Sequence, residues 1–128
     1  ADAAGDLARI NELEMQIWVD GPRRAPDEVN PAVRALAAQM NAVALANEGV
    51  GEEQALRPPA AGRLAELAVP LLVITGEVDA ARTQATAEHL RAALPQARRA
   101  VVPAAAHLPG MEQPAVVNRL VIEFLVEE

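Results

Sequence analysis

The stretch that decides the fold is VPLLVITGEVD, residues 69–79. Its centre is a short, continuous apolar run that ends at Gly76, a pattern typical of a strand buried on both faces of a parallel sheet. An acidic residue, Asp79, follows this predicted strand. A second short apolar run occupies residues 100–102, and a histidine, His107, comes soon after it. The sequence therefore predicts two buried strands, each followed by a side chain that can hold or transfer a proton.

Helical periodicity surrounds the two predicted strands. Residues 83–94 carry apolar side chains at helical spacing and stop at Pro95, and a last helix is expected to start at Pro114. The order strand, helix, strand, helix describes a βαβ unit with one further helix. Two parallel strands do not make a stable sheet on their own. We therefore expect one edge of this pair to be covered by something that the chain does not contain.

The N-terminal half predicts two helices and a linker. Residues 6–17 fit an amphipathic helix with Asp6 as its N-cap, broken from Trp18 onward. Asn30 followed by proline predicts the start of a second helix, which should reach about Asn47. The next residues, 48–61, are rich in Gly, Glu and Pro and predict an exposed linker.

Composition limits the functions that this chain can have. Eleven basic residues, all arginine, oppose 18 acidic ones, and the formal charge of -7 argues against nucleic acid or anionic membrane partners. The absence of cysteine excludes disulfides and thiolate metal sites. No stretch predicts a membrane span or a signal peptide, so we expect a cytoplasmic protein. The chain begins with Ala1 rather than Met, which suggests a processed or excised segment.

An acid and a base are expected to meet at one edge of the sheet. Adjacent parallel strands bring their carboxyl ends to the same rim. There the Asp79 carboxylate can accept the Nδ1 proton of His107, which leaves Nε2 free to take a proton. The plainer alternatives are that Asp79 caps the following helix and that His107 is an ordinary loop histidine. The other histidine, His89, falls in the middle of a predicted helix and should be exposed, so we expect no metal site and no cofactor.

A nucleophile is missing from this pair. The chain contains neither serine nor cysteine, and an acid and a base alone cannot perform acyl transfer. Its hydroxyl side chains are Thr75, inside the first predicted strand, and Thr83 and Thr86, at the start of a helix. None of them lies in a turn suited to a nucleophile. The chain is therefore either part of a larger catalytic unit or a relative that has lost its chemistry.

Residues 64–127 resemble the C-terminal part of α/β-hydrolase-fold enzymes. Residues 69–79 resemble the strand and acid loop of that family, and AHLPGMEQP, residues 106–114, resembles its histidine loop. The resemblance implies the C-terminal portion of an α/β-hydrolase fold, with two parallel strands, flanking helices and a helical lid segment. The family order of nucleophile, acid and histidine implies that Asp79 is the triad acid and His107 the triad base.

The N-terminal half resembles the lid that some bacterial members insert before the acid strand, on the evidence of residues 12–22 and 30–34. The resemblance implies a lid (cap) segment with its linker over residues 1–61 and a βαβα part of the hydrolase core over residues 62–128. Within such a lid, Trp18 and Met40 are candidates for lining a substrate pocket. The alternative for both side chains is plain packing between lid helices.

The function implied by the resemblance is hydrolysis of ester-like bonds in a small-molecule substrate. The Gly-x-Ser-x-Gly elbow and the oxyanion donors would come from an N-terminal half that is not in this chain. One further departure is alanine in the histidine loop, where the family often has glycine near the position of Ala104 or Ala106. If the missing nucleophile were Asp, the protein would be an epoxide hydrolase or a dehalogenase. The remaining alternative is a non-catalytic remnant that acts as an interaction module through its sheet edge or lid helices.

Overall fold

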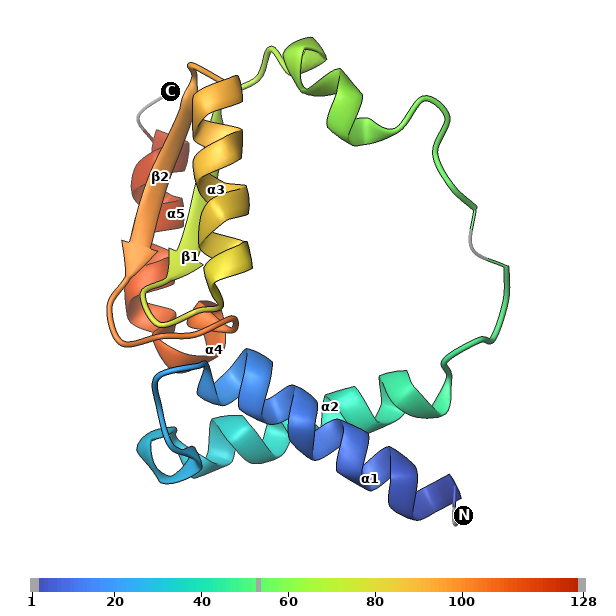
Figure 1. Cartoon of the computed structure of the whole chain (residues 1–128). Coiled ribbons are helices and arrows are strands. Elements are labelled where there is room, and N and C mark those ends of the chain that lie inside the picture. Colours follow the sequence, from blue (N-terminus) through green and yellow to red (C-terminus); the bar gives the residue numbers. More distant parts are fainter. Residues whose placement is uncertain (1–2, 53, 127–128) are drawn as a thin grey trace.

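The computed structural model describes residues 3–52 and 54–126 of the chain (Figure 1). A helical N-terminal half and a strand-containing C-terminal half are joined by an extended linker. In chain order the elements are α1 (Ala3–Glu14), the π-helical η1 (Met15–Asp20), the short η2 (Pro26–Glu28), α2 (Pro31–Ala46), η3 (Ala60–Glu66), β1 (Leu71–Gly76), α3 (Ala81–Ala93), β2 (Ala97–Val102), α4 (Pro109–Glu112) and α5 (Pro114–Val126).

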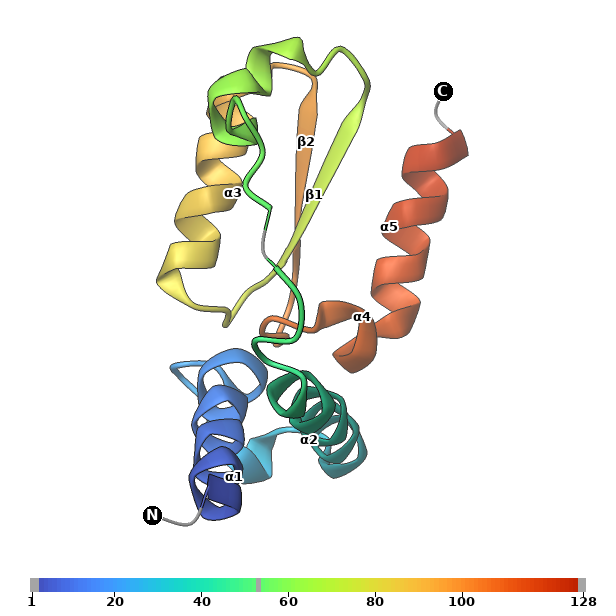
Figure 2. The same cartoon turned by 90° about the vertical axis from the view of Figure 1, so that its right-hand side faces the viewer.

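The two strands form the sheet in the described part of the chain, and they run parallel. Their register pairs Leu71 with Ala97 and Gly76 with Val102, so the carboxyl ends of both strands lie at the same level. Helices α3 and α5 lie on opposite sides of the strand pair (Figure 2). The predicted βαβ unit with one further helix is therefore confirmed. The carboxyl ends of both strands point toward the α1–α2 pair (Figure 1).

Strand β2 is longer than the prediction of residues 100–102. It begins at Ala97, and the added residues include Arg98 and Arg99, which interrupt the apolar pattern. Arg99 donates to Glu88 Oε1 on α3 at 2.8 Å, whereas the Arg98 guanidinium lies 5.9 Å from the centre of the Phe124 ring on α5. Successive strand residues point to opposite faces. The helices on the two faces thus supply partners for both arginines, which an apolar-run criterion cannot detect.

Helix boundaries in the N-terminal half differ from the prediction at one helix and agree at the other. Helix α1 begins at Ala3, so Asp6 lies in its first turn and is not the N-cap. The helix does not break at Trp18 but continues as η1 to Asp20. For α2 the predicted cap is confirmed, because the Asn30 side chain accepts a hydrogen bond from the amide of Ala32 at 2.9 Å.

Smaller differences occur at the linker and in the C-terminal half. In the predicted linker, residues 48–61, the described residues 54–59 are irregular, and η3 begins at Ala60 (Figure 1). Helix α3 begins at Ala81, two residues before the predicted start. The short α4 precedes the helix that was predicted from Pro114, and α5 begins at that proline as expected.

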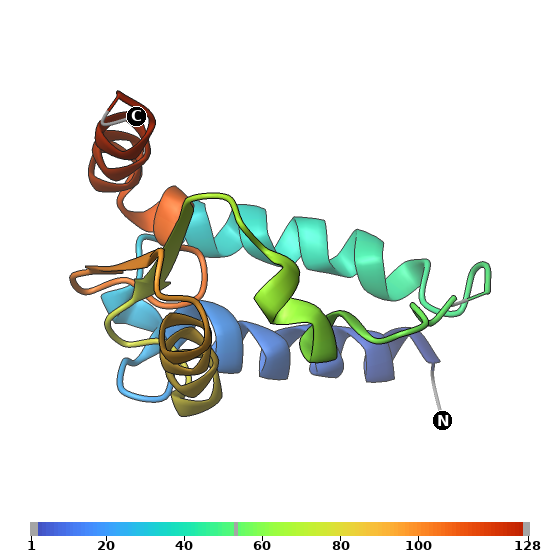
Figure 3. The same ribbon diagram turned by 90° about the horizontal axis from the view of Figure 1, so that it is seen from above.

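The buried core is small and lies near the junction of the two halves. Helices α1 and α2 lie side by side (Figure 3), and the core cluster between their ends is formed by Met15, Val19, Val29 and Ala37. Leu108, from the loop after β2, packs against this cluster. The hydrophobic core thus connects the helical half directly to the loop that carries His107.

Candidate functional site

The acidic residue of the site lies in the turn between β1 and α3. Asp79 is 5% exposed. Its Oδ1 accepts a hydrogen bond from the amide of Ala80 at 2.6 Å, and its Oδ2 lies 2.9 Å from Nδ1 of His107. The N-cap of α3 is Ala80, and no side chain caps it. The interpretation of Asp79 as a helix cap is therefore wrong, and its carboxylate is directed at the histidine instead.

His107 follows β2 and lies at the contact between the two halves of the chain. Its amide donates to the carbonyl oxygen of Trp18 at 3.0 Å, and its ring centre lies 4.8 Å from that of Trp18. An ionised carboxylate can only accept, so an ionised Asp79 facing a neutral ring requires the proton on Nδ1 and the lone pair on Nε2. The His107 side chain is 44% exposed, whereas the Asp79 side chain is 2% exposed. The arrangement therefore combines a buried acceptor with an accessible base.

Two glycines let the backbone segments of the site approach one another closely. A Cβ added at Gly76 would collide with the carbonyl oxygens of Ala105 and Ala106. A Cβ added at Gly21 would lie 2.6 Å from the carbonyl oxygen of Val78. Gly21 also has a φ of 77°, which residues with a Cβ rarely adopt. These positions bring the acid loop, the histidine loop and the end of η1 together.

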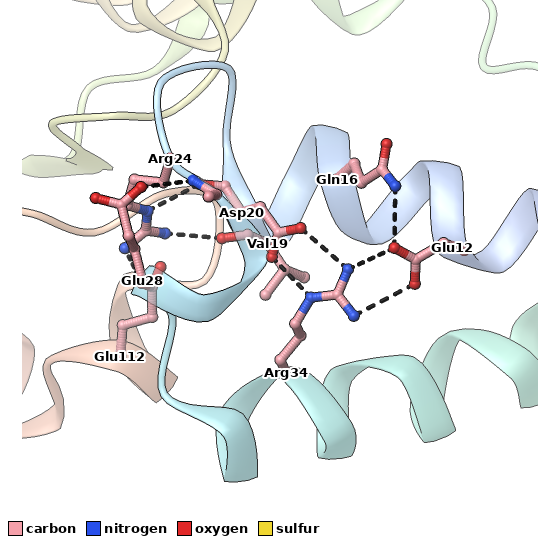
Figure 4. Close-up of polar contacts among 9 residues, drawn as sticks. Glu12, Gln16, Val19, Asp20, Arg24, Glu28, Arg34 and Glu112 are labelled. Atoms are coloured by element: carbon pink, nitrogen blue, oxygen red, sulfur yellow. Dashed lines mark hydrogen bonds and ion pairs between the residues drawn. The ribbon is translucent and has the colours of Figure 1, made fainter.

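The histidine loop is fixed by hydrogen bonds to charged side chains. Glu112 Oε1 accepts from the amide of Ala106 at 2.7 Å, and Glu77 Oε2 accepts from the amide of Ala104 at 2.9 Å. Ala104 has a φ of 54°, in the left-handed region where the sequence resemblance led us to expect glycine. Arg24 forms an ion pair with Glu112 Oε2 at 2.7 Å. Figure 4 shows this pair next to the end of η1.

A second arginine cluster joins α1, η1 and α2 in the N-terminal half (Figure 4). Arg34 donates to both carboxylate oxygens of Asp20, at 2.9 and 3.0 Å, and to Glu12 at 2.8 Å. Asp20 is 1% exposed, so its charge needs this partner. Hydrogen bonds to Asp20 and Glu12 raise the pKa of Arg34, and the hydrogen bond from Arg34 lowers the pKa of Glu12. The guanidinium therefore stays charged and ties α1, η1 and α2 together.

A groove of about 420 Å³ opens beside His107, between the N-terminal helices and the histidine loop. Both residues that the sequence singled out, Trp18 and Met40, line this groove. Met40 is not buried by packing between the helices, because the residue is 59% exposed. The full lining is Met15, Trp18, Val19, Ala37, Met40, Asn41, Ala44, His107, Leu108 and Met111.

Sequence reasoning missed most of the groove, although one signal was available. All three methionines of the chain line it, together with its single tryptophan. Methionine is flexible and polarisable, and it is frequent at binding surfaces that adapt to their ligands. In a chain so poor in large side chains, the positions of Met15 and Met111 were therefore informative before the fold was known.

A second hollow of about 360 Å³ lies on the other side of the Trp18–His107 pair. It is lined by β1 residues, among them Val73 and Thr75, and by α3 residues, among them Thr83 and Leu90. His107 thus borders both the lid groove and a hollow beside the first strand. Thr75 is 4% exposed, and no described threonine lies in a strand-to-helix turn, as the sequence predicted.

The structure bears on two other expectations. His89 is exposed in the middle of α3, and within residues 3–52 and 54–126 no three acidic or histidine side chains gather in a way that could hold a metal ion. Within the same residues, no helix has both the length and the apolar character that crossing a membrane requires.

Comparison with known proteins finds similarity to α/β-hydrolases. The chain is 31% identical over 103 residues to a Bacillus subtilis protein called a putative 2-succinyl-6-hydroxy-2,4-cyclohexadiene-1-carboxylate synthase. It superposes on a thermophilic esterase from Thermogutta terrifontis with a TM-score of 0.69 and 28% identity, covering 97% of this chain. It superposes on carboxylesterase CesB from Bacillus subtilis with a TM-score of 0.62 and 27% identity, covering 98% of this chain. No family model matches the chain.

The chain spans less than half of each of these proteins. It covers 37% of the curated Bacillus subtilis relative, 47% of the Thermogutta esterase and 44% of the carboxylesterase. A bromoperoxidase from Bacillus anthracis, with a TM-score of 0.60 and 18% identity, shares the fold over 94% of this chain and 44% of its own length. The similarity therefore extends over nearly all of this chain and over a minority of each relative.

Proposed function

We propose, from the premise that this chain is the C-terminal portion of an α/β-hydrolase fold, that it supplies the acid and the base of a hydrolase for ester-like bonds. In this proposal residues 1–61 are the lid with its linker, and residues 62–128 are the end of the catalytic core. The serine nucleophile, on a Gly-x-Ser-x-Gly elbow, belongs to an N-terminal half outside this chain. No cofactor takes part.

The observation that carries the proposal is the 2.9 Å contact between a buried Asp79 and a half-exposed His107 beside an apolar groove. In the first step, Nε2 of His107 takes the proton of the serine as the serine attacks the ester carbonyl. Asp79 holds the imidazole in the required tautomer and stabilises the imidazolium. His107 then protonates the leaving alcohol, and afterwards it activates the water that hydrolyses the acyl-enzyme.

The groove supports an uncharged, apolar group as the part of the substrate that contacts the lid. Three methionines, Trp18 and Leu108 are among its lining residues, and the lining includes no arginine. The apolar lining is therefore matched to simple esters, in agreement with the esterase relatives.

The base assignment is tested by replacing each histidine in the intact protein that carries this chain. We expect His107→Ala and Asp79→Asn to lower kcat for p-nitrophenyl esters by about 10⁴-fold, because acyl transfer loses its base or the tautomer of that base. His89→Ala is the matched control, since His89 is exposed on α3 and away from the groove. Unchanged hydrolysis in His107→Ala would disprove the proposal and favour a non-catalytic interaction module.

The two lid residues are tested by separating binding from chemistry. We expect Trp18→Ala and Met40→Glu to raise KM for a hexanoyl ester by about tenfold, since each removes apolar contact area from the groove. The same variants should change KM for an acetyl ester much less. Equal effects on both esters would count against contact between the groove and the acyl chain.

The partner and the nucleophile are tested by intact-mass spectrometry of the purified native protein. We expect a second polypeptide of domain size, or one longer chain, with a Gly-x-Ser-x-Gly elbow that a fluorophosphonate probe labels. Labelling on an aspartate by a mechanism-based alkyl halide or epoxide would instead assign a dehalogenase or an epoxide hydrolase. A folded 13.5 kDa species alone would contradict the two-part hydrolase.

A further inference from the structure

The backbone amides of His107 and of the residue before it are held by contacts from elsewhere in the chain. The amide of His107 donates to the Trp18 carbonyl at the end of the lid helix. The amide of the preceding residue, Ala106, donates to the Glu112 carboxylate at 2.7 Å. Both amides are therefore fixed by an acceptor outside the loop, which limits how far the imidazole can move relative to Asp79.

Glu112 does not hold this loop alone. Its second carboxylate oxygen pairs with Arg24 at 2.7 Å, and the two side chains are 7% and 12% exposed. Arg24 also donates to the carbonyl oxygens of Val19 and Asp20, each at 2.8 Å, and to that of Ala104 at 2.7 Å. One guanidinium thus binds the end of the lid helix, the histidine loop and the carboxylate that anchors this loop.

The lid contains a second arginine, Arg34, that pairs with a buried carboxylate and provides an internal comparison. Arg34 pairs with Asp20 and Glu12, and these partners all belong to α1, η1 and α2. The Arg34 cluster therefore stabilises the lid without touching the histidine loop. The Arg24 cluster, by contrast, crosses from the lid to that loop.

We propose that Arg24 and Glu112 are positioning residues that make the alignment of His107 depend on the seating of the lid. When the lid is seated, Arg24 lies on Glu112, and Glu112 in turn holds the amide next to the base. When the lid lifts, Glu112 loses the cation that holds it in place, and the Ala106 amide loses a fixed acceptor. This proposal rests on the proposed role of His107 as the base, and it adds that the base is aligned only beneath a seated lid.

The first test is spectroscopic and needs no turnover. In the intact protein, the proton between Nδ1 of His107 and Asp79 should give a far-downfield proton NMR signal, assigned by its loss in His107→Ala. We expect this signal to broaden or vanish in Arg24→Met and in Glu112→Gln, because the ring is no longer held against Asp79. Arg24→Lys keeps the charge but cannot bind three carbonyls at once, and it should retain part of the signal.

Arg34→Met is the matched control, because it breaks a pair between an arginine and a buried carboxylate of the lid that does not reach the loop. We expect it to lower the melting temperature at least as much as Arg24→Met while leaving the downfield signal intact. If Arg24→Met and Glu112→Gln keep the signal, or if Arg34→Met abolishes it equally, the positioning role is disproved and Arg24 is simply part of the packing.

Kinetics supply the second test. We expect Arg24→Met and Glu112→Gln to lower kcat by between about 10- and 100-fold with KM for an acetyl ester unchanged, as for a small misplacement of a catalytic group. Failure of the proposed function is distinguishable from failure of this inference. In the first case His107→Ala keeps full hydrolysis, whereas in the second His107→Ala is inactive and Arg24→Met retains wild-type kcat.

Discussion

The rim at the carboxyl ends of the strands and the body of the same sheet are built very differently. At the rim, Asp79, Ala105 and Ala106 are buried, and hydrogen bonds cross between the acid loop, the histidine loop and the lid. In the body, the described residues of α5 include none that is buried, and Ile122 and Leu125 are 59% and 64% exposed. The contacts within the chain are therefore concentrated at the rim, whereas apolar side chains of α5 stay exposed.

This difference bears on the N-terminal half that we propose lies outside this chain. Polar contacts at the rim are satisfied within the chain, so the acid–base pair can be aligned without outside help. Apolar side chains in the body remain in water, which costs free energy that a covering partner would recover. In the proposed two-part hydrolase, the partner would therefore supply stability and a nucleophile more than the geometry of Asp79 and His107.

The largest effect should come from filling the closest approach at the rim. Gly76→Ala places a Cβ against the carbonyl oxygens of Ala105 and Ala106, and backbone atoms cannot yield as a flexible side chain can. We expect a loss of about 3 kcal/mol or more in the free energy of unfolding, measured by urea denaturation. Gly62→Ala, where a Cβ meets open space, is the control and should change stability by less than about 0.5 kcal/mol. Similar values for both variants would show that the rim is not tightly packed.

A somewhat smaller effect is expected from the lid side of the rim. Arg34→Met leaves the carboxylate of Asp20 buried without its cation. We expect the free energy of unfolding to fall by about 3 kcal/mol, and Asp20→Asn combined with Arg34→Met to restore part of the loss. Thermal denaturation of the single and double variants tests this coupling. Simple addition of the two single effects would contradict it.

A gain in the free energy of unfolding is expected at Ala104, where the histidine loop carries alanine in a left-handed conformation. Ala104 has a φ of 54°, which costs a residue with a Cβ about 1–2 kcal/mol. Replacement by glycine removes that cost but adds freedom to the unfolded chain, so we expect a net gain of about 0.5 kcal/mol. The matched control is Ala106→Gly, at a buried position outside the left-handed region, which should lose stability. A loss in both variants would mean that the loop relaxes around Ala104.

A smaller, pH-dependent effect should come from Glu12. Its pKa is lowered by the hydrogen bond from Arg34. A carboxyl group whose pKa is lower in the folded state stabilises the protein above its unfolded pKa, and this contribution is lost as the pH falls through the folded value. We expect Glu12→Gln to cost a few tenths of a kcal/mol at pH 7 and less at pH 3, below the ordinary pKa of Glu12, and the effect is small because the Glu12 side chain is 50% exposed. An equal cost at both pH values would exclude the ion pair as its cause.

The smallest effect should come from the body of the sheet. Leu125→Gln on α5 changes a side chain that is already 64% exposed, so the free energy of unfolding of this chain should shift by less than about 0.5 kcal/mol. The same change should weaken association with the half that completes the sheet, which can be followed by native mass spectrometry. A large loss of stability in the chain alone would show that α5 is packed here, and the contrast between rim and body would fail.

The sequence by itself determined the strand–helix–strand–helix order and the pairing of an acid with a base. Gly76 and the turn residues after each apolar run place Asp79 and His107 at the same ends of adjacent parallel strands, and topology then makes them neighbours. The alignment of Asn30 and Pro31 similarly predicted the start of α2, because a cap is a local interaction. These features depend on residues that are close in sequence or on rules that hold for any parallel strand pair.

Only the tertiary structure decided how the lid meets the site. The extension of η1 to Asp20, the two arginines inside β2 and the Arg24–Glu112 pair all depend on partners that are distant in sequence. Likewise, the groove exists because Met15, Met40 and Met111 converge from three separate segments. Local pattern cannot reveal such contacts, since the free energy that fixes them comes from burial and charge pairing that appear only when the halves of the chain come together.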